Sequence, residues 1–520
     1  MGPTGSGALK GRTVGLVEPF HPILAASLPD FSRKQCPALT NAPERLSKKN
    51  FTTIAVLIVS SFVVILNETI MNVALPVLMV EFDVTADAIQ WLATIFMLTM
   101  AVVIPMTGFL LQVLSTRKVF LLAMGLFALG TTLAALAPGF GVLLVARVIQ
   151  ACGTAVMMPL LMTTILDLVP PARRGVLMGN VSIVISVAPA IGPTLSGLIL
   201  QYLSWRFMFI VIIPIAILAL VIGTPRLGNE SGQAKTPLSG LSILLAVPGF
   251  GGLVFGLSRL SAGGASVLNV GILILAVLCL AAFAFLQSRL QREDKALLDL
   301  RPLTYRDFTL SLVLMMFAMV ALFGVIILLP MFFTNVLGME TLTTGLIMLP
   351  GGLLMGVLAP FVGRMYDKVG PRPLVVPGAL VLTAVLFAYA LILDSTTPIW
   401  LLVLLHLAMS LGMALIFTPA FTTALNPLPH HLHSHGSALL STLQQLGGAM
   451  GTALVVGVVA ATTASKLAAG SDKLVATVEG FAPGFLVGAA CSVGILVIGF
   501  LLGGKKELAT QESENAPAMH

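Results

Sequence analysis

Two ionisable residues stand deep inside long apolar stretches of this sequence. Glu68 lies within the stretch 53–78, and Arg147 lies within the stretch 140–164. A charged side chain costs about 2.5–3.5 kcal/mol at the centre of a membrane helix, so it persists there only where it is paired or used. Because burial favours the neutral form of a carboxylic acid, a buried Glu68 would be able to take up and release a proton. Glu68 is therefore a candidate proton carrier.

The neighbours of Glu68 refine this hypothesis. Asn72 lies one helical turn further on, so it shares a face with Glu68 and is expected to contact the same ligand or water. Asn67 is neutral, which leaves Glu68 to carry the charge alone. Two alternatives stay open. In the first, Glu68 faces a neighbouring helix and not the transport path, because a shift of one residue rotates a side chain by about 100°. In the second, Glu68 merely pairs with Arg147.

The elements that position these residues must be membrane helices. Hydrophobic residues make up 57% of the 520 residues and charged residues only 9%, against roughly 25% charged residues in soluble domains. A helix needs about 20 apolar residues to cross a bilayer, and the apolar runs are too long for barrel strands. The sequence predicts an all-α polytopic protein with fourteen spans, at 53–78, 88–111, 118–137, 140–164, 176–202, 207–224, 238–258, 268–288, 309–337, 344–363, 372–393, 399–424, 437–461 and 482–503.

The basic residues predict the orientation of these spans. With the N-terminus placed in the cytoplasm, 23 of the 28 Lys and Arg residues lie inside, Arg147 lies within a helix, and four lie outside: Arg206, Arg259, Lys466 and Lys473. Positively charged loops stay in the cytoplasm, so both termini are expected there. The basic residues form no stripe or basic helix, which excludes nucleic-acid binding despite the net charge of +7.

An internal repeat divides the chain. Gly108, Gln112, Ser115 and Arg117 correspond to Gly363, Asp367, Gly370 and Arg372 at a constant offset of 255 residues. The same offset relates the predicted spans 176–202 and 437–461, where Ser182, Ser186 and Gly192 correspond to Ser437, Ser441 and Gly447. The repeat predicts homologous six-helix bundles at 51–225 and 301–504, joined by two inserted helices in 226–300. Residues 1–50 are expected to form a basic cytoplasmic leader, and 505–520 a polar cytoplasmic tail.

Enzymatic and metal motifs are missing from the sequence. There is no phosphate-binding G-x-x-x-x-G-K-[ST] loop, no HExxH motif and no paired catalytic carboxylates, so we expect no enzyme and no cofactor. The four cysteines are widely separated and read as small apolar residues. Four histidines, His430, His431, His433 and His435, have no Cys or acid nearby in sequence and are expected in a solvated loop, with no metal site.

Five motifs in chain order resemble those of the fourteen-span drug:proton antiporters of the major facilitator superfamily. They are LNETIMNVALP (66–76), RVIQACG (147–153), AIGPTLSG (190–197), GRMYDKVGPR (363–372) and HGSALLSTLQQ (435–445). The last motif is similar to the lincosamide-resistance branch of that family. The resemblance covers roughly residues 51–503. One departure is Asn67, which occupies a position where the family usually has Asp.

The resemblance implies a fold and a function. The fold is the major facilitator fold, with two six-helix bundles plus two linker helices. The function is proton-coupled export of small lipophilic drugs or toxic compounds across the plasma membrane, by alternating access and by a monomer. Export of an endogenous metabolite or of a toxic product made by the cell itself remains open. The resemblance makes Arg147 a conformational or proton-relay residue. The alternative is a purely structural role, as a hydrogen-bond donor to carbonyls or side chains of the first span, 53–78. Glu68, Asn72 and Gln150 become the substrate contacts.

Two further motifs predict conformational residues. In the fifth predicted span, Pro193 removes a backbone donor, while Gly192, Ser196 and Gly197 allow a neighbouring backbone to approach closely. We expect this segment to form a flexible contact between the halves; an ordinary tight helix crossing is the alternative.

The loop after the tenth span holds an acid among bases. Asp367 lies between Arg364, Lys368 and Arg372, close behind Gly363, and such a charge cluster suits a latch that breaks and reforms. In the equivalent first-half loop Gln112 replaces the acid, so that loop is expected to lack a charged latch.

Overall fold

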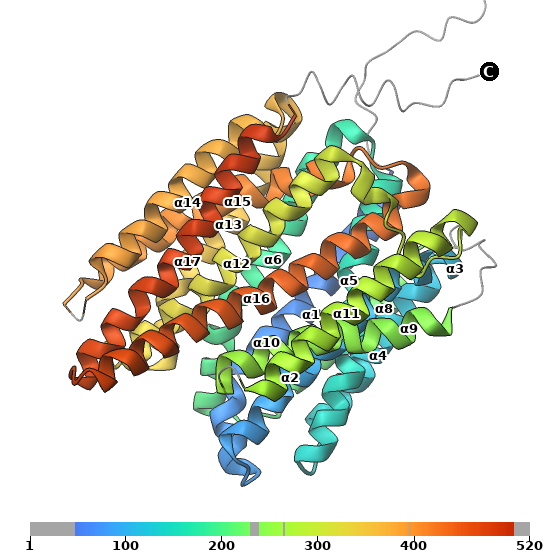
Figure 1. The fold of residues 1–520 in the computed structure, drawn as a ribbon. Helices are drawn as coiled ribbons and strands as arrows, with labels where there is room; N and C mark the ends of the chain where they lie inside the picture. The colour runs from blue at the N-terminus through green and yellow to red at the C-terminus, as the bar shows by residue number, and fades with distance from the viewer. Residues whose placement is uncertain (1–46, 229–238, 264–265, 395, 504–520) are drawn as a thin grey trace, which may run out of the picture. The chain divides into compact units, whose positions relative to one another are not determined.

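The computed structural model describes residues 47–228, 239–263, 266–394 and 396–503, and all regular structure in them is helical (Figure 1). The long helices are α1 (Lys48–Glu81), α2 (Ala86–Val103), α4 (Thr116–Ala135), α5 (Phe140–Leu168), α6 (Arg174–Tyr202), α11 (Val267–Leu290), α12 (Arg306–Asn335), α13 (Thr341–Val369), α14 (Arg372–Ile392), α15 (Ile399–Leu425), α16 (His433–Ala468) and α17 (Lys473–Leu501). Shorter helices are α3 (Thr107–Val113), α7 (Phe207–Ile210), α8 (Ile212–Gly223), α9 (Gly240–Ala246) and α10 (Gly252–Gly263). The tail 505–520 and nearly all of the leader 1–50 lie outside the described residues.

The predicted membrane spans agree with these helices. Thirteen of the described helical segments are long and apolar enough to cross a bilayer. The remaining predicted span, 207–224, corresponds to the shorter apolar helix Phe207–Gly223, which is divided into α7 and α8. The thirteenth predicted span begins later than the observed α16, because the histidines at 433 and 435 continue the helix despite their polarity.

Local chemistry sets several helix ends. The Thr85 side chain accepts a hydrogen bond from the Ala88 N–H and begins α2. Gly370 ends α13 with φ of 81°, a conformation that favours glycine, and α14 begins two residues later. Its counterpart in the repeat, Ser115, has φ of −64° and joins α3 to α4 through extended backbone. The two equivalent loops therefore turn in different ways.

The helices pack into two groups joined by close contacts. In the first group α4 packs against α5 and α8, and α1 packs against α6; in the second, α14 packs against α15 and α17, and α12 against α16. Figure 1 shows the first group in blue to teal and the second in yellow to red. The most extensive contact in the described chain joins the groups and pairs α6 with α13, while α16 contacts α3 and α5.

The two inserted spans lie beside these groups. The first consists of α9, a π-helical turn at Val247–Gly251 and α10; the second is α11. α10 packs against both α2 and α16, whereas α11 carries exposed apolar side chains such as Leu275 and Leu278. α11 is therefore a peripheral helix that presents apolar surface outward.

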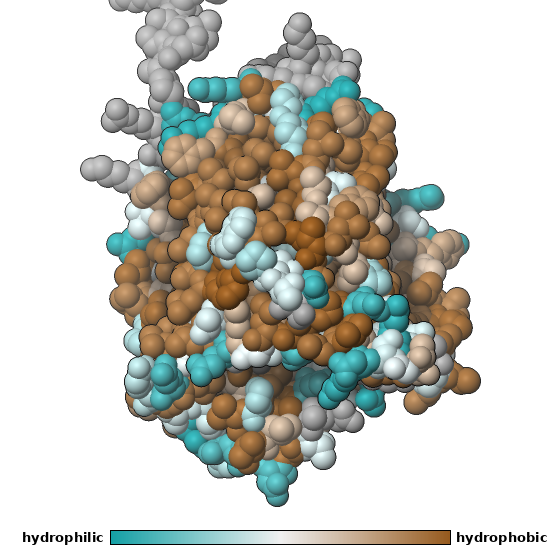
Figure 2. Space-filling model, turned by 90° about the vertical axis from the view of Figure 1, so that its left-hand side faces the viewer, coloured by the Kyte–Doolittle hydropathy of each residue, from teal (hydrophilic) through white to brown (hydrophobic). Residues whose placement is uncertain are grey.

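The outer surface matches a bilayer. Figure 2 shows apolar side chains covering the middle of one face, with hydrophilic side chains gathered toward its ends. Large apolar residues are exposed on many helices, among them Leu129, Val221, Val357, Leu391 and Val497. Such a surface is stable in hydrocarbon and would aggregate in water.

Candidate functional site

Glu68 lies on α1 within the span Lys49–Met71 and is partly exposed. It forms no hydrogen bond or ion pair within the described residues, and the charge that acts on it is that of Arg147. Asn67 is only 1% exposed, and its amide oxygen has no hydrogen-bond partner in the described chain. Glu68 thus keeps access to a small ligand or water, while Asn67 faces packed protein. The Asn72 side chain lies outside the described residues.

Arg147 is fixed by a buried network that links three helices. Its Nε donates to the Leu92 carbonyl of α2 at 3.3 Å, and its Nη1 donates to Gln150 Oε1 at 2.6 Å. Gln150 Nε2 in turn donates to Thr131 Oγ1 of α4 at 2.9 Å. The guanidinium also lies 3.9 Å from the centre of the Phe96 ring. Arg147 and Gln150 are 1% and 0% exposed.

This network bears on two purely structural roles: Arg147 as a donor to groups of α1, and Glu68 as the ion-pair partner of Arg147. Arg147 donates to α2 and to its own helix, not to the carbonyls of α1. No ion pair joins it to Glu68 in the described part of the chain, although the two charges influence each other. Gln150 is occupied by Arg147 and Thr131 on its two polar atoms, so any contact with a substrate requires the network to rearrange.

The glycine–proline segment of α6 lies between two helices. A Cβ on Gly192 would overlap the Thr69 side chain of α1, the residue next to Glu68. On the other side, a Cβ on Gly345 of α13 would lie 3.0 Å from Thr194 Oγ1. Pro193 lies inside this helix, and Ser196 is buried with an Oγ that has no partner among the described residues. The segment therefore connects the surroundings of Glu68 to α13.

The contact between α6 and α13 depends on small residues along its length. Gly363 approaches the backbone of Gly175, and Gly352 approaches Ala190 so closely that a Cβ would overlap in both cases. By contrast, a Cβ on Gly197 would meet Leu342 at 3.5 Å, an ordinary van der Waals distance. Close backbone approach of this kind is the usual basis of helix packing in membranes.

Polar contacts gather at one end of the helices. We call this the latch end and define it by Asp167, Arg174, Asp367 and His433. Asp367 Oδ1 accepts a hydrogen bond from the Gly175 N–H at 3.1 Å, at the first turn of α6. Arg174 donates to the Leu166 carbonyl at 2.8 Å and to Asn426 Oδ1 at 3.3 Å. The start of α6 is thereby tied to the last turn of α13 and to Asn426, which directly follows α15.

The predicted latch residues have different surroundings. Asp367 faces the positive end of the α6 dipole, where a carboxylate is stabilised. Arg372 is exposed, and its guanidinium lies 5.8 Å from the centre of the Phe500 ring. Gln112 Nε2 donates to the His431 carbonyl at 3.3 Å, a contact without charge. The amide at 112 thus occupies the place of the acid but makes a neutral hydrogen bond.

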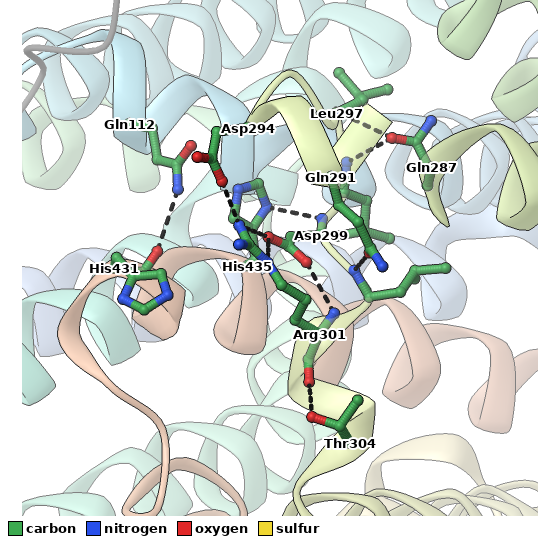
Figure 3. A network of polar contacts seen from close by, with 12 residues as sticks. Gln112, Gln287, Gln291, Asp294, Leu297, Asp299, Arg301, Thr304, His431 and His435 are labelled. Carbon is green, nitrogen blue, oxygen red and sulfur yellow. Dashed lines mark hydrogen bonds and ion pairs between the residues drawn. The ribbon is translucent and has the colours of Figure 1, made fainter. Parts of the chain in front are cut away.

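A buried loop supports the latch end (Figure 3). Asp299 is 2% exposed; its backbone N–H donates to His435 Nδ1 at 3.2 Å, and its carboxylate accepts from Arg301 Nε at 2.7 Å. This hydrogen bond raises the pKa of Arg301 above its ordinary value. Gln287 of α11 holds the same loop by accepting from the Leu297 N–H at 2.8 Å. The inserted helices are therefore connected to α16 by polar contacts.

Sequence reasoning missed the surroundings of four residues of interest. The expectation of a solvated histidine loop is wrong for His433 and His435, which are 4% and 2% exposed. Asp167, remote in sequence, lies 3.0 Å from His433 Nδ1. His406 of α15 is buried, with Nε2 3.2 Å from the Met348 carbonyl and Nδ1 unpartnered in the described chain. A histidine within an apolar span was itself a signal for His406.

Comparison with known proteins identifies the family. The sequence model that describes the Major Facilitator Superfamily as a protein family matches residues 57–452 of this chain. The chain therefore belongs to this superfamily and is a multi-pass membrane transporter of small substrates, not an enzyme.

Individual relatives support the same assignment. The chain is 38% identical over 467 residues to an uncharacterized MFS-type transporter, YcnB, of Bacillus subtilis, covering 89% of this chain and 97% of that protein. It is also 38% identical over 408 residues to the lincomycin resistance protein LmrB of Bacillus subtilis, covering 78% and 84%. Among solved structures, the proton:xylose symporter XylE matches with a TM-score of 0.60 at 16% identity, covering 90% of this chain and 100% of that one. The last similarity establishes the fold alone.

Proposed function

We propose that this transporter exports small lipophilic compounds across the plasma membrane in exchange for protons, by alternating access. The similarity to lincomycin resistance proteins supports export of drug-like compounds. The distribution of Lys and Arg supports an orientation with both termini and the latch end in the cytoplasm. The polar contacts at the latch end then close the cytoplasmic side.

Glu68 is the observation that carries the proposal. It is a partly exposed carboxylate inside a membrane span, without an ion pair among the described residues. Such a residue is costly, and proton transfer explains its presence. One charge crossing 100 mV supplies about 2.3 kcal/mol, and each 1.4 kcal/mol supports a tenfold gradient. One proton per cycle would therefore sustain roughly a fortyfold gradient of substrate.

The remaining site residues take supporting roles in this proposal. Arg147 and Gln150 relay the protonation state of Glu68 to α2 and α4 through their hydrogen bonds, and Gln150 meets substrate together with Glu68 and Asn72. Gly192, Pro193, Ser196 and Gly197 form the moving contact of α6. Gly363, Asp367 and Arg372 belong to the cytoplasmic latch.

The architecture of the proposal follows the repeat in the sequence. The bundles 51–225 and 301–504 rock against each other, the inserted segment 226–300 stays peripheral, and a monomer suffices. Both bundles would move about the contact between α6 and α13, which is the most extensive one in the described chain.

Glu68→Gln tests the proposal, because it removes the titratable proton and retains the shape of the side chain. We expect folded, membrane-inserted protein that no longer exports against a gradient, measured by dye or drug accumulation in a pump-deficient host with and without an uncoupler. Glu81→Gln is the matched control, since Glu81 lies at the exposed end of the same helix, 3.6 Å from Arg206. Normal, uncoupler-sensitive export by Glu68→Gln would assign the proton role to another residue.

The same assay addresses the substrate class. A panel of lipophilic drugs should show reduced accumulation in cells that carry the wild-type chain. If no drug responds, while membrane vesicles still export a compound extracted from the native host, the substrate is an endogenous metabolite or a toxic product of that cell.

A further inference from the structure

Three side chains of metal-binding type converge at the latch end from elements far apart in the sequence. Asp167 lies in the last turn of α5, while His430 and His433 lie in the 3₁₀ turn His430–Leu432 and at the first residue of α16. Asp167 Oδ1 is 3.0 Å from His433 Nδ1 and 3.3 Å from His430 Nε2. The three possible ligand atoms lie within 4.8 Å of one another, a grouping found nowhere else in the described residues.

The orientation of His433 suits a metal ligand. Its Nε2 lies 3.1 Å from the Leu428 carbonyl, to which an Nε2–H donates, and Nδ1 then presents a lone pair toward Asp167. Metal-binding histidines are usually oriented in this way by a carbonyl or carboxylate behind the ring. The His433 side chain is only 5% exposed, so packing holds the ring in place.

The other two ligands leave the site open to solvent. The Asp167 side chain is 28% exposed and that of His430 is 81% exposed, so an ion could enter and keep a water ligand. In a tetrahedral zinc site with bonds of about 2.0–2.1 Å, neighbouring ligand atoms are roughly 3.3 Å apart. The observed spacings of 3.0 and 3.3 Å are close to that value. Two imidazoles and one carboxylate favour zinc or a similar transition metal over Mg²⁺ or Ca²⁺.

We propose that Asp167, His430 and His433 form a regulatory site for a transition-metal ion such as Zn²⁺, which holds the latch end closed. Because α5 and α16 must separate before this end opens, an ion bound to both stabilises the closed state. At a free concentration 100 times its dissociation constant, the ion would shift the ratio of closed to open molecules by about 100-fold. This lock rests on the proposed transport cycle, whereas metal binding itself does not.

Binding is tested on the purified full-length chain after treatment with a chelator. Zn²⁺ titrated by calorimetry should bind once per molecule and raise the unfolding temperature, while Mg²⁺ should do neither. His430→Ala should weaken Zn²⁺ binding at least about 10-fold without disturbing the fold, because that side chain is exposed. His433→Ala should weaken binding further. His431→Ala is the matched control, since His431 belongs to the same loop but not to the cluster.

Inhibition is tested separately, in liposomes that contain the transporter. Zn²⁺ should slow export by the wild type and by His431→Ala but not by His430→Ala, and a chelator should restore the rate. Equal Zn²⁺ binding by wild type and His430→Ala would overturn the site, and binding without slower export would overturn the lock. If the wild type exports nothing even without zinc, the proposed function is contradicted. The binding experiment would then still show whether the metal site exists.

Discussion

At the scale of single residues, Asn67 and Glu68 have opposite surroundings although they are neighbours on α1. Asn67 is buried, with an amide oxygen that has no partner in the described chain, whereas Glu68 is partly exposed and unpaired there. A carboxylate at position 67 would lose its hydration without gaining a partner, which is costly. Proton exchange is therefore expected only at position 68.

This contrast predicts that an acid at position 67 cannot replace Glu68 in export. The double variant Asn67→Asp/Glu68→Gln moves the acid to position 67, where the resemblance to the drug:proton antiporters would place it. We expect the protein to insert but not to export, and to unfold at a lower temperature than Glu68→Gln alone. Glu68→Asp, which keeps the acid on its face of the helix, should retain part of the export. Restored export in the double variant would show that α1 presents position 67 to the transport path.

At the scale of elements, α6 connects the surroundings of Glu68 to the second group of helices. Its Gly192 lies against Thr69 of α1, and its N-terminal Gly175 lies against Asp367 at the end of α13. A movement of α6 therefore changes the contacts with both Thr69 and Asp367. The helix holds two prolines, Pro189 and Pro193, each of which removes a backbone hydrogen bond and eases bending.

Two glycines of α6 should differ in their tolerance of a methyl group. Gly192→Ala would overlap Thr69, so we expect a loss of about 1–3 kcal/mol in stability, together with slower export. Gly197→Ala places its Cβ 3.5 Å from Leu342 and should be nearly neutral. Thermal unfolding in detergent measures the difference. Adding Thr69→Ala to Gly192→Ala should recover part of the loss, and the absence of any recovery would assign the cost to another contact.

Substitutions at the equivalent ends of α13 and α3 should also differ in their effect. Asp367→Asn keeps an acceptor for the Gly175 N–H but removes the charge at the start of α6, which costs about 0.3–1 kcal/mol. We expect slower export because the closed latch end is weakened. Gln112→Ala loses only one exposed neutral hydrogen bond and should export at nearly the normal rate. Export rates in vesicles compare the two variants, and equal losses would show that the charge at 367 has no special role.

At the scale of the whole molecule, the contacts that join the two groups of helices cluster at the latch end and along α6 and α13. Gln112 and His431, Arg174 and Asn426, and Asp167 and His433 all make hydrogen bonds between segments more than 200 residues apart. The proposed alternating-access cycle requires these contacts to break each time the latch end opens.

Cross-linking tests this requirement. Cysteines introduced by Gln112→Cys and His431→Cys, in a chain whose native cysteines are replaced by alanine, should react with a short thiol-specific cross-linker. We expect the linked protein to stop exporting, and reduction of a cleavable linker to restore export. Each single variant treated in the same way is the control. Full export by the linked protein would mean that this end of the molecule need not open.

The sequence by itself determined the membrane spans, the superfamily and the presence of a carboxylate within the first span. These properties depend on composition, on the length of apolar runs and on local motifs, all of which are legible along the chain. The position of Glu68 along α1 was likewise predictable, because depth in a membrane follows from the number of residues in the helix.

Only the tertiary structure decided what each side chain faces. The rotation of α1 separates a buried Asn67 from a partly exposed Glu68, and the packing of α2 against α5 directs Arg147 to the Leu92 carbonyl. Likewise, Asp167 meets His433 only because α5 lies beside α16. Helical periodicity places residues on faces, but an apolar helix in a bilayer has no water-facing side to fix its rotation. Contacts between helices supply that information, and they join residues that are hundreds of positions apart.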